Sequence, residues 1–169
     1  VNPETERLDY DLIAKIAEEN HPKVIIAGYS SYPWIPDWVQ FKRIAESVGA
    51  YLFADVSHIA GLIAAGLCAS PIGIADVVTF TTHKTLCGPR GAVVVTHNKE
   101  IGEKIDKAVF PGEQGGPHVN TIAAMALTFE LAKTDQFKEL QVQTLKNAAA
   151  LAEAFQKNGV KVPYRGTDS

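Results

Sequence analysis

Residues 75–96 read ADVVTFTTHKTLCGPRGAVVVT and hold two β-branched runs, 75–81 and 91–96, on either side of a polar segment. Short runs rich in Val and Thr and bounded by Gly, Pro or charged residues are typical of strands. Two more such runs precede this stretch, KVIIAGY at 23–29 and AYLFADV at 50–56. We therefore predict four strands, and their nearly continuous apolar character indicates burial on both faces.

Helical patterns alternate with these strands. Asp9 is a predicted N-cap for a helix over 10–20, and a second helix is predicted over 37–48. A short apolar helix is predicted around 59–65. The inner stripe of the second helix is Trp38, Phe41, Ile44 and Ala45. Strands and helices in alternation predict an α/β fold with a mostly parallel sheet and helices on both faces.

The C-terminal part of the sequence is helical in pattern. Helices are predicted over 98–108 and 120–133. A long helix follows, with Asp135 as its predicted N-cap and its end near residue 158, where Gly159 suits the C-cap. Residues 160–162 are predicted to begin a further strand.

Composition and charge narrow the classes of function. The net charge is −3, the pI is about 5.9 and no Lys/Arg cluster stands out, so we expect neither nucleic acid nor membrane as a partner. The longest apolar run, 59–70, is shorter than the roughly 20 residues of a membrane-spanning helix. Cys68 and Cys87 lack the spacing of a metal site or a disulfide framework, which favours a reducing cytoplasm and no bound metal. Because the chain starts without Met and stops where another element is expected, we expect a piece of a longer polypeptide.

Polar residues follow three of the predicted strands. Ser30 and Ser31 follow the first strand, residues 55–58 follow the second, and residues 81–84 follow the third. The carboxyl ends of parallel strands meet at one edge of a sheet, where ligands of α/β proteins bind. The sequence therefore predicts a site at this edge.

Two of these residues suggest a specific chemistry. Lys84 follows an apolar strand, where burial favours the neutral amine, a nucleophile towards an aldehyde. Asp55 ends a buried strand, where a protonated ring nitrogen would compensate its charge, although it could equally cap the next helix. Pyridoxal phosphate combines such an aldehyde with such a ring. His58 has no third metal ligand at suitable spacing, and it is either structural or faces the cofactor.

Weaker signals surround this pair. Arg90 lies in a Gly-Pro-Arg-Gly turn, where it either braces the site or stabilises the turn. Gly115 and Gly116 could bring backbone N–H groups close to a phosphate or simply form a flexible loop. No phosphate loop, dinucleotide fingerprint or Gly-x-Ser-x-Gly elbow is present in the sequence.

Three stretches together resemble the serine hydroxymethyltransferase family, whose members are pyridoxal phosphate enzymes of the aspartate-aminotransferase fold type. They are ADVSHIAGLIAAG at 54–66, VTFTTHKTLCGPRG at 78–91 and FPGEQGGP at 110–117. Their order and spacing also match, and the likeness covers essentially all 169 residues. Ser57 departs from the family pattern, because an Ala often packs behind the cofactor ring at that position.

The resemblance implies roles for the residues at the strand ends. Lys84 would form the Schiff base with the cofactor, and Asp55 would pair with its pyridine nitrogen. His58 would lie near the ring and its O3′ atom, and Ser30 would approach the O3′ edge. These four residues would make up the first part of the cofactor site.

The resemblance also implies roles for neighbouring residues. Thr81 and His83 would flank the lysine, and Thr81 could relay protons. Arg90 would neighbour the site. Gly115 and Gly116 would reach the cofactor phosphate of a partner subunit, because family active sites lie at the interface of a homodimer, or of a dimer of dimers.

The implied reaction converts serine and tetrahydrofolate reversibly to glycine and 5,10-methylenetetrahydrofolate. Residues 1–133 would be the cofactor-binding portion of the large domain, and 134–169 the long helix and the start of a truncated small domain. The substrate-carboxylate and folate residues would lie outside the chain, so this fragment alone would bind cofactor weakly and not turn over.

Two alternatives remain open at this point. A threonine aldolase-like lyase would share Asp55 and Lys84 but need no folate. A non-catalytic α/β binding fragment would have lost its site with the missing parts, and it would form no adduct on Lys84.

Overall fold

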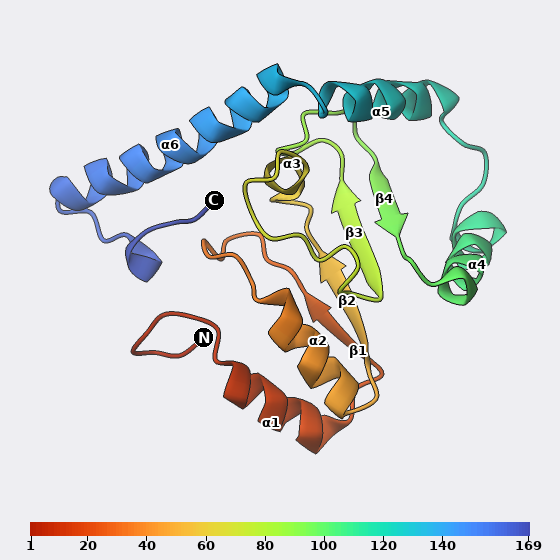
Figure 1. Cartoon of the computed structure of the whole chain (residues 1–169), viewed down its shortest axis with the longest axis horizontal. Helices are drawn as coiled ribbons and strands as arrows, with labels where there is room; N and C mark the ends of the chain where they lie inside the picture. Colours follow the sequence, from red (N-terminus) through yellow and green to blue (C-terminus); the bar gives the residue numbers. More distant parts are fainter.

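Four strands form one sheet in the order β1-β2-β3-β4 (Figure 1). The computed structural model describes residues 1–169, except for the side chain of Arg165. The first two pairs of neighbouring strands are parallel and the last pair is antiparallel. The strands are β1 (Val24–Ala27), β2 (Tyr51–Asp55), β3 (Val77–Thr81) and β4 (Ala92–Val95). The predicted α/β fold with a mostly parallel sheet is therefore confirmed.

The direction of β4 differs from the expected parallel arrangement. Val78 pairs with Val95 and Thr81 with Ala92, which is an antiparallel register. A parallel return needs a crossover of about a dozen residues or more, usually a helix, and segment 82–91 is too short to supply one. The chain therefore turns back on itself, and Lys84 lies within this connection.

Two helices, α1 (Tyr10–Asn20) and α2 (Trp38–Ser47), cover one face of the sheet (Figure 1). Each begins at an aspartate that accepts a backbone N–H, Asp9 from Leu12 and Asp37 from Gln40. The predicted inner stripe of α2 is buried, as expected from its spacing. It packs with strand residues into the main core, which contains Ala27, Trp38, Phe41, Ala45, Leu52, Ala54 and Val78.

The opposite face of the sheet is only partly covered. Helix α4 (Lys99–Lys107) places Ile101 and Ile105 in a groove that strand residues such as Phe53 and Val94 also line. Ile26 stays 70% exposed. Helices therefore lie on both faces, but the second face carries one helix and keeps exposed apolar side chains.

Three more helices pack near the carboxyl ends of the strands: α3 (Ala60–Ala64), α5 (Val119–Leu131) and α6 (Asp135–Lys157) (Figure 1). Thr134, rather than the predicted Asp135, caps α6, because its hydroxyl accepts the N–H of Phe137. The predicted strand at 160–162 is wrong. That segment pairs with no sheet edge and leads into a 3₁₀ turn at Pro163–Arg165.

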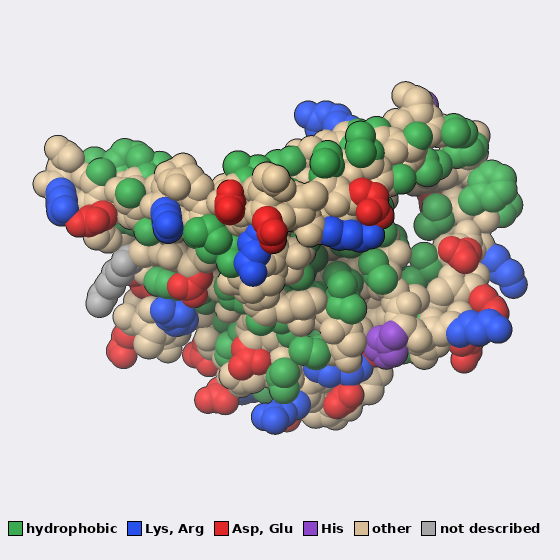
Figure 2. Space-filling model, turned by 45° about the horizontal axis from the view of Figure 1, so that its top comes forward, with side chains coloured by type: hydrophobic (Ala, Val, Ile, Leu, Met, Phe, Trp, Pro, Cys, Tyr) green, Lys and Arg blue, Asp and Glu red, His purple; other side chains and the backbone are tan. Residues whose placement is uncertain are grey.

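Helix α6 leaves several large apolar side chains exposed. Phe137 is buried, whereas Leu151 is 56% exposed and Phe155 45%. Figure 2 shows hydrophobic side chains along the ridge that α5 and α6 form. Among the described helices, none is both long and apolar enough to cross a membrane.

Candidate functional site

The carboxyl ends of β1, β2 and β3 meet at one edge of the sheet, as predicted. The chain leaving β1 passes directly over the end of β2, because a Cβ atom added at Gly28 would lie 2.1 Å from the Asp55 carbonyl oxygen. Only glycine allows this approach. It brings the loop that carries Ser30 towards the strand end that carries Asp55.

A chain of hydrogen bonds joins the two residues that the sequence marked as chemically most significant. The Ser57 N–H donates to Asp55 Oδ1 at 2.9 Å. The Thr81 N–H donates to Ser57 Oγ at 3.1 Å, and Lys84 Nζ donates to Thr81 Oγ1 at 2.9 Å. The carboxylate at the end of β2 and the amine beyond β3 are thus parts of one connected arrangement.

Ser57 has a role in this arrangement that sequence reasoning missed. Its side chain is buried, and its hydroxyl accepts the backbone N–H of the last residue of β3. Ser57 differs by one oxygen atom from the Ala that often occupies this position in the family pattern. The available signal was a small polar residue two positions after the Asp that ends a strand.

Asp55 is more exposed than expected. Asp55 is exposed at the end of β2, so the argument from burial of its charge does not hold. The alternative role as a helix cap is also wrong, since α3 begins after Ile59 without a side-chain cap. Oδ1 holds the turn to Ser57, and no described residue donates to Oδ2. The carboxylate is therefore free to receive an external donor.

Lys84 is half-buried in the connection between β3 and β4. The Thr81 hydroxyl is its hydrogen-bond partner, and no described carboxylate forms an ion pair with it. Other described lysines do form ion pairs; Lys42 Nζ, for example, lies 2.8 Å from Asp76 Oδ1. Lys84 thus presents an amine that no counter-charge occupies.

The residue after Lys84 fixes the connection on α3. Thr85 Oγ1 donates to the His58 carbonyl at 2.9 Å and accepts the N–H of Gly61 at 3.0 Å. A Cβ atom at Gly61 would lie 2.2 Å from the Thr85 carbonyl oxygen, so the approach requires glycine. These contacts position Lys84 relative to the end of β2.

His58 and Asp55 line a small cavity of about 20 Å³ together with aromatic residues of the loop after β1. Tyr29 and Tyr32 lie in this aromatic wall with their ring centroids 5.3 Å apart. Burial raises the pKa of Tyr29 to about 12, so its phenol stays neutral at physiological pH. Sequence reasoning did not identify this wall, although Tyr29 directly precedes Ser30.

His83 is half-buried beside Lys84 in the chain. Its Nδ1 atom is buried, and no described residue forms a hydrogen bond with it. A buried ring nitrogen without a partner is unusual, because desolvation is then uncompensated. His83 therefore has one hydrogen-bonding position available.

The remaining predicted residues are not drawn into this arrangement by any described contact. Ser30 and Arg90 are exposed. Gly115 and Gly116 lie in the exposed segment before α5, where an added Cβ would meet nothing within 4 Å. Their roles stay predictions.

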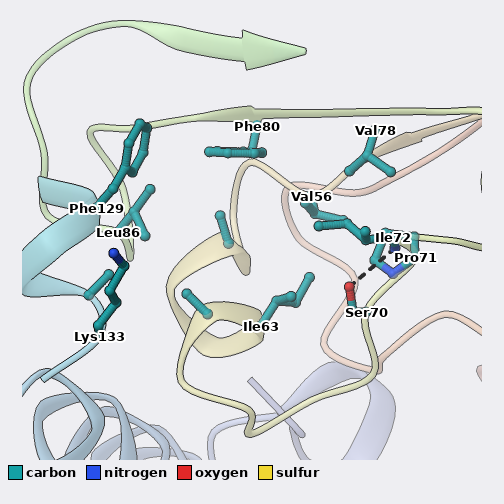
Figure 3. Close-up of a pocket in the computed structure, with 13 residues that line it drawn as sticks. Val56, Ile63, Ser70, Pro71, Ile72, Val78, Phe80, Leu86, Phe129 and Lys133 are labelled. Carbon is teal, nitrogen blue, oxygen red and sulfur yellow. Dashed lines mark hydrogen bonds between the residues drawn. The ribbon is translucent and has the colours of Figure 1, made fainter. Parts of the chain in front are cut away.

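A larger cavity, of about 300 Å³, has an apolar lining that includes Leu86 of the connection between β3 and β4 (Figure 3). Side chains of α3, β3 and α5 line it, including Ile63, Phe80 and Phe129, and Lys133 lies at its rim. None of the predicted site residues lines it. The chemistry therefore belongs to the smaller polar region at the strand ends.

The arrangement offers an amine nucleophile, a carboxylate with a free oxygen and a hydroxyl that holds the amine. These groups suit capture of an aldehyde by Lys84 and binding of a cationic ring nitrogen by Asp55. Within the described side chains, no group of three or more His, Cys, Asp or Glu is placed to hold a metal ion.

Comparison with known proteins agrees with this chemistry. A model of the serine hydroxymethyltransferase family matches residues 1–169. A serine hydroxymethyltransferase of Cyanothece sp. is 53% identical over 169 residues, which is 100% of this chain and 40% of that protein. One of Lactobacillus gasseri is 52% identical over 170 residues, covering 100% and 41%, and one of Synechococcus sp. is 50% identical over 169 residues, covering 100% and 39%. The chain spans about 40% of the length of these relatives.

Proposed function

Because the chain belongs to the serine hydroxymethyltransferase family, we propose that it forms the central part of an enzyme that interconverts serine and glycine. Tetrahydrofolate would carry the one-carbon unit. The observation that carries the proposal is the hydrogen-bonded connection from Asp55 through Ser57 and Thr81 to Lys84. Since the chain spans about 40% of its relatives, the activity is proposed for a polypeptide of full family length that contains it.

Pyridoxal 5'-phosphate is the proposed cofactor, and the residues fit it. Lys84 has the amine that would hold its aldehyde carbon covalently, and no described carboxylate competes for that amine. Asp55 Oδ2 has no donor among the described residues, so it can accept a hydrogen bond from the ring nitrogen. When bound, the cofactor stabilises the electron pair released at the substrate's α-carbon.

The protein's own contribution is to hold protons and charges in place. Thr81 Oγ1 lies next to Lys84 Nζ, where it can take up or return a proton as the amine changes partners. Asp55 keeps a negative charge opposite the ring nitrogen. His58 lines the same cavity as Asp55 and is proposed to face the ring, with Ser30 at its O3′ edge.

The other proposed roles involve the rest of the assembly. Gly115 and Gly116 are proposed to approach the cofactor phosphate of a partner subunit, which makes the enzyme a homodimer or a dimer of dimers. Arg90 is proposed to neighbour the site, and His83 to flank the lysine.

The division of the chain is proposed from the same premise. Residues 1–133 would belong to the cofactor-binding large domain, and 134–169 to the long helix and the start of a small domain. Cys68 and Cys87 are free thiols, which is compatible with the proposed cytoplasmic location.

The decisive experiment locates the covalent bond. A full-length protein containing this chain is saturated with pyridoxal phosphate, reduced with borohydride, digested and analysed by mass spectrometry. We expect the adduct on the peptide with Lys84, and none in Lys84→Ala. Lys133→Ala is the control, because Lys133 lies in an exposed pair with Glu130. An adduct elsewhere, or none, would contradict the proposal.

A second measurement tests the reaction. Serine cleavage by the full-length protein is expected to depend on tetrahydrofolate. A protein that cleaves threonine equally well without folate would be a lyase instead.

A further inference from the structure

Gln141 is an unusual residue in α6. This helix buries two side chains, Phe137 and Gln141, and leaves most of its apolar residues exposed. Gln141 is 2% exposed, which is rare for a long polar side chain. A glutamine in such a position has to be explained by what its amide contacts.

The amide of Gln141 contacts the connection that carries Lys84. Its Nε2 atom donates to the backbone carbonyl of Thr85 at 2.8 Å. Its Oε1 atom is also buried, and no described residue donates to it. The desolvation cost of the amide is thus only partly offset, so an apolar residue of similar volume would be the better choice for packing alone.

The hydrogen bond from Gln141 is one of several contacts that fix Thr85 in place. The Thr85 hydroxyl already joins the chain at His58 and Gly61. Gln141, 56 positions further along the sequence in α6, also holds the carbonyl of Thr85. Within the connection, the Cys87 N–H donates to the Lys84 carbonyl at 2.9 Å and the Gly88 N–H donates to the Thr82 carbonyl at 2.7 Å, so the backbone on both sides of Lys84 is fixed.

We propose that Gln141 is a positioning residue for Lys84: by holding the Thr85 carbonyl, it makes α6 part of the support of the cofactor-binding lysine. Adjacent Cα atoms are about 3.8 Å apart, so a shift of Thr85 is passed directly to Lys84. The inference rests on the proposed function of Lys84 and adds a contribution from the C-terminal part of the chain.

Gln141→Met tests the proposal in the full-length protein, because methionine has a similar volume but no N–H donor. Gln143→Met is the matched control, since Gln143 is exposed on the same helix and bonds only Asn147. The first readout is the rate at which cofactor-free protein captures pyridoxal phosphate, followed by the visible absorbance of the bound cofactor. The second is hydrogen exchange at the Cys87 amide, and the third is the split between kcat and KM.

For Gln141→Met we expect capture to slow about tenfold and Cys87 to exchange faster, because small misplacements of reacting groups have large effects on rate. We expect kcat to fall in parallel with the rate of cofactor capture. The KM for serine is expected to change by less than about twofold. Gln143→Met should match the wild type in all three readouts. Gln141→Glu retains the shape but replaces the donor by an acceptor, so it is expected to be slower than Gln141→Met.

Two results would overturn the inference. One is capture and Cys87 exchange in Gln141→Met equal to those of Gln143→Met. The other is Gln141→Glu as fast as wild type, which also decides the matter if the methionine variant does not fold. If wild type itself attaches no cofactor to Lys84, the proposed function fails first, which separates the two failures.

Discussion

Lys84 Nζ donates a hydrogen bond to Thr81 Oγ1 at 2.9 Å, across the turn that follows β3. This contact ties the amine to the last residue of β3, whose backbone N–H donates to Ser57 Oγ, and the Ser57 N–H donates in turn to Asp55 Oδ1. The amine and the carboxylate are therefore held by neighbouring strands. A change at Thr81 should affect Lys84 without changing the sheet.

Thr81→Val removes the hydroxyl and keeps the β-branched shape, whereas Thr81→Ser keeps the hydroxyl. We expect the valine variant of the full-length enzyme to exchange amino acids at the cofactor about 10²-fold more slowly, because proton transfer at a positioned group contributes at least that much. The serine variant should stay within a few-fold of wild type. Stopped-flow absorbance measures both rates, and equal rates for the two variants would rule out a role for the hydroxyl.

Lys42 and Asp76 form a clip that joins α2 to the sheet. Lys42 Nζ lies 2.8 Å from Asp76 Oδ1, and Asp76 Oδ2 accepts the N–H of Leu52 at 2.7 Å. Burial alone would raise the pKa of the Asp76 carboxyl, but the bonds from Lys42 and Leu52 outweigh it and lower the pKa. The stabilisation is therefore fully present above the ordinary pKa of about 3.9 and is lost as the pH falls through the lowered value.

Asp76→Ala removes this clip, and we expect it to cost about 1–3 kcal/mol, because the partly buried Lys42 ammonium loses its nearer acceptor and the Leu52 N–H loses its acceptor. The loss should appear at neutral pH as a lower melting temperature and as faster hydrogen exchange at Leu52. The difference in stability between Asp76→Ala and wild type should shrink as the pH falls through the lowered pKa of Asp76. Asp106→Ala, on the exposed surface of α4, is the control. An unchanged Leu52 exchange rate would contradict the structural role of Asp76.

Gly61 and Gly102 provide a matched pair of glycine substitutions. A Cβ atom at Gly61 would lie 2.2 Å from the Thr85 carbonyl oxygen, whereas at Gly102 its nearest neighbour would be the Thr96 methyl at 3.4 Å. We expect Gly61→Ala to lose about 1–3 kcal/mol and to weaken cofactor binding, since α3 must move from the Lys84 connection. Gly102→Ala should be neutral or stabilise by up to about 1 kcal/mol, because alanine favours a helix interior. Denaturant unfolding of the two variants compares them, and an undisturbed Gly61→Ala would contradict the close packing.

The sequence predicts those features that depend on local signals. Asp9 precedes an amphipathic helix and caps it as expected, whereas Asp37, predicted as the first residue of its helix, is the N-cap of that helix. The stripe from Trp38 to Ala45 follows helical spacing and is buried. The convergence of Asp55 and Lys84 follows from the carboxyl ends of parallel strands.

Other features depend on tertiary contacts that no local signal reveals. The antiparallel direction of β4 follows from the geometry of segment 82–91, not from the composition of its strand. Asp55 is exposed although the chain leaving β1 passes close to its backbone, and the pattern of apolar residues along β2 does not reveal this exposure. Ser57 and Gln141 act through partners 24 and 56 positions away in the chain, so their residue type alone gives no indication of them.

Asp55→Asn separates the charge of this residue from its structural bond. The amide oxygen of asparagine can still accept the Ser57 N–H that Asp55 Oδ1 now accepts at 2.9 Å, so the turn after β2 should be kept. The negative charge proposed to face the ring nitrogen is lost, and removal of one such electrostatic partner typically slows catalysis by about 10²–10³-fold. We therefore expect Asp55→Asn in the full-length enzyme to keep its melting temperature and to lose activity on that scale. Asp55→Ala should lose both, because the Ser57 N–H is then left without its acceptor. If Asp55→Asn retained wild-type activity, the charge would have no part in the reaction and the bond to Ser57 would be the only function of Asp55.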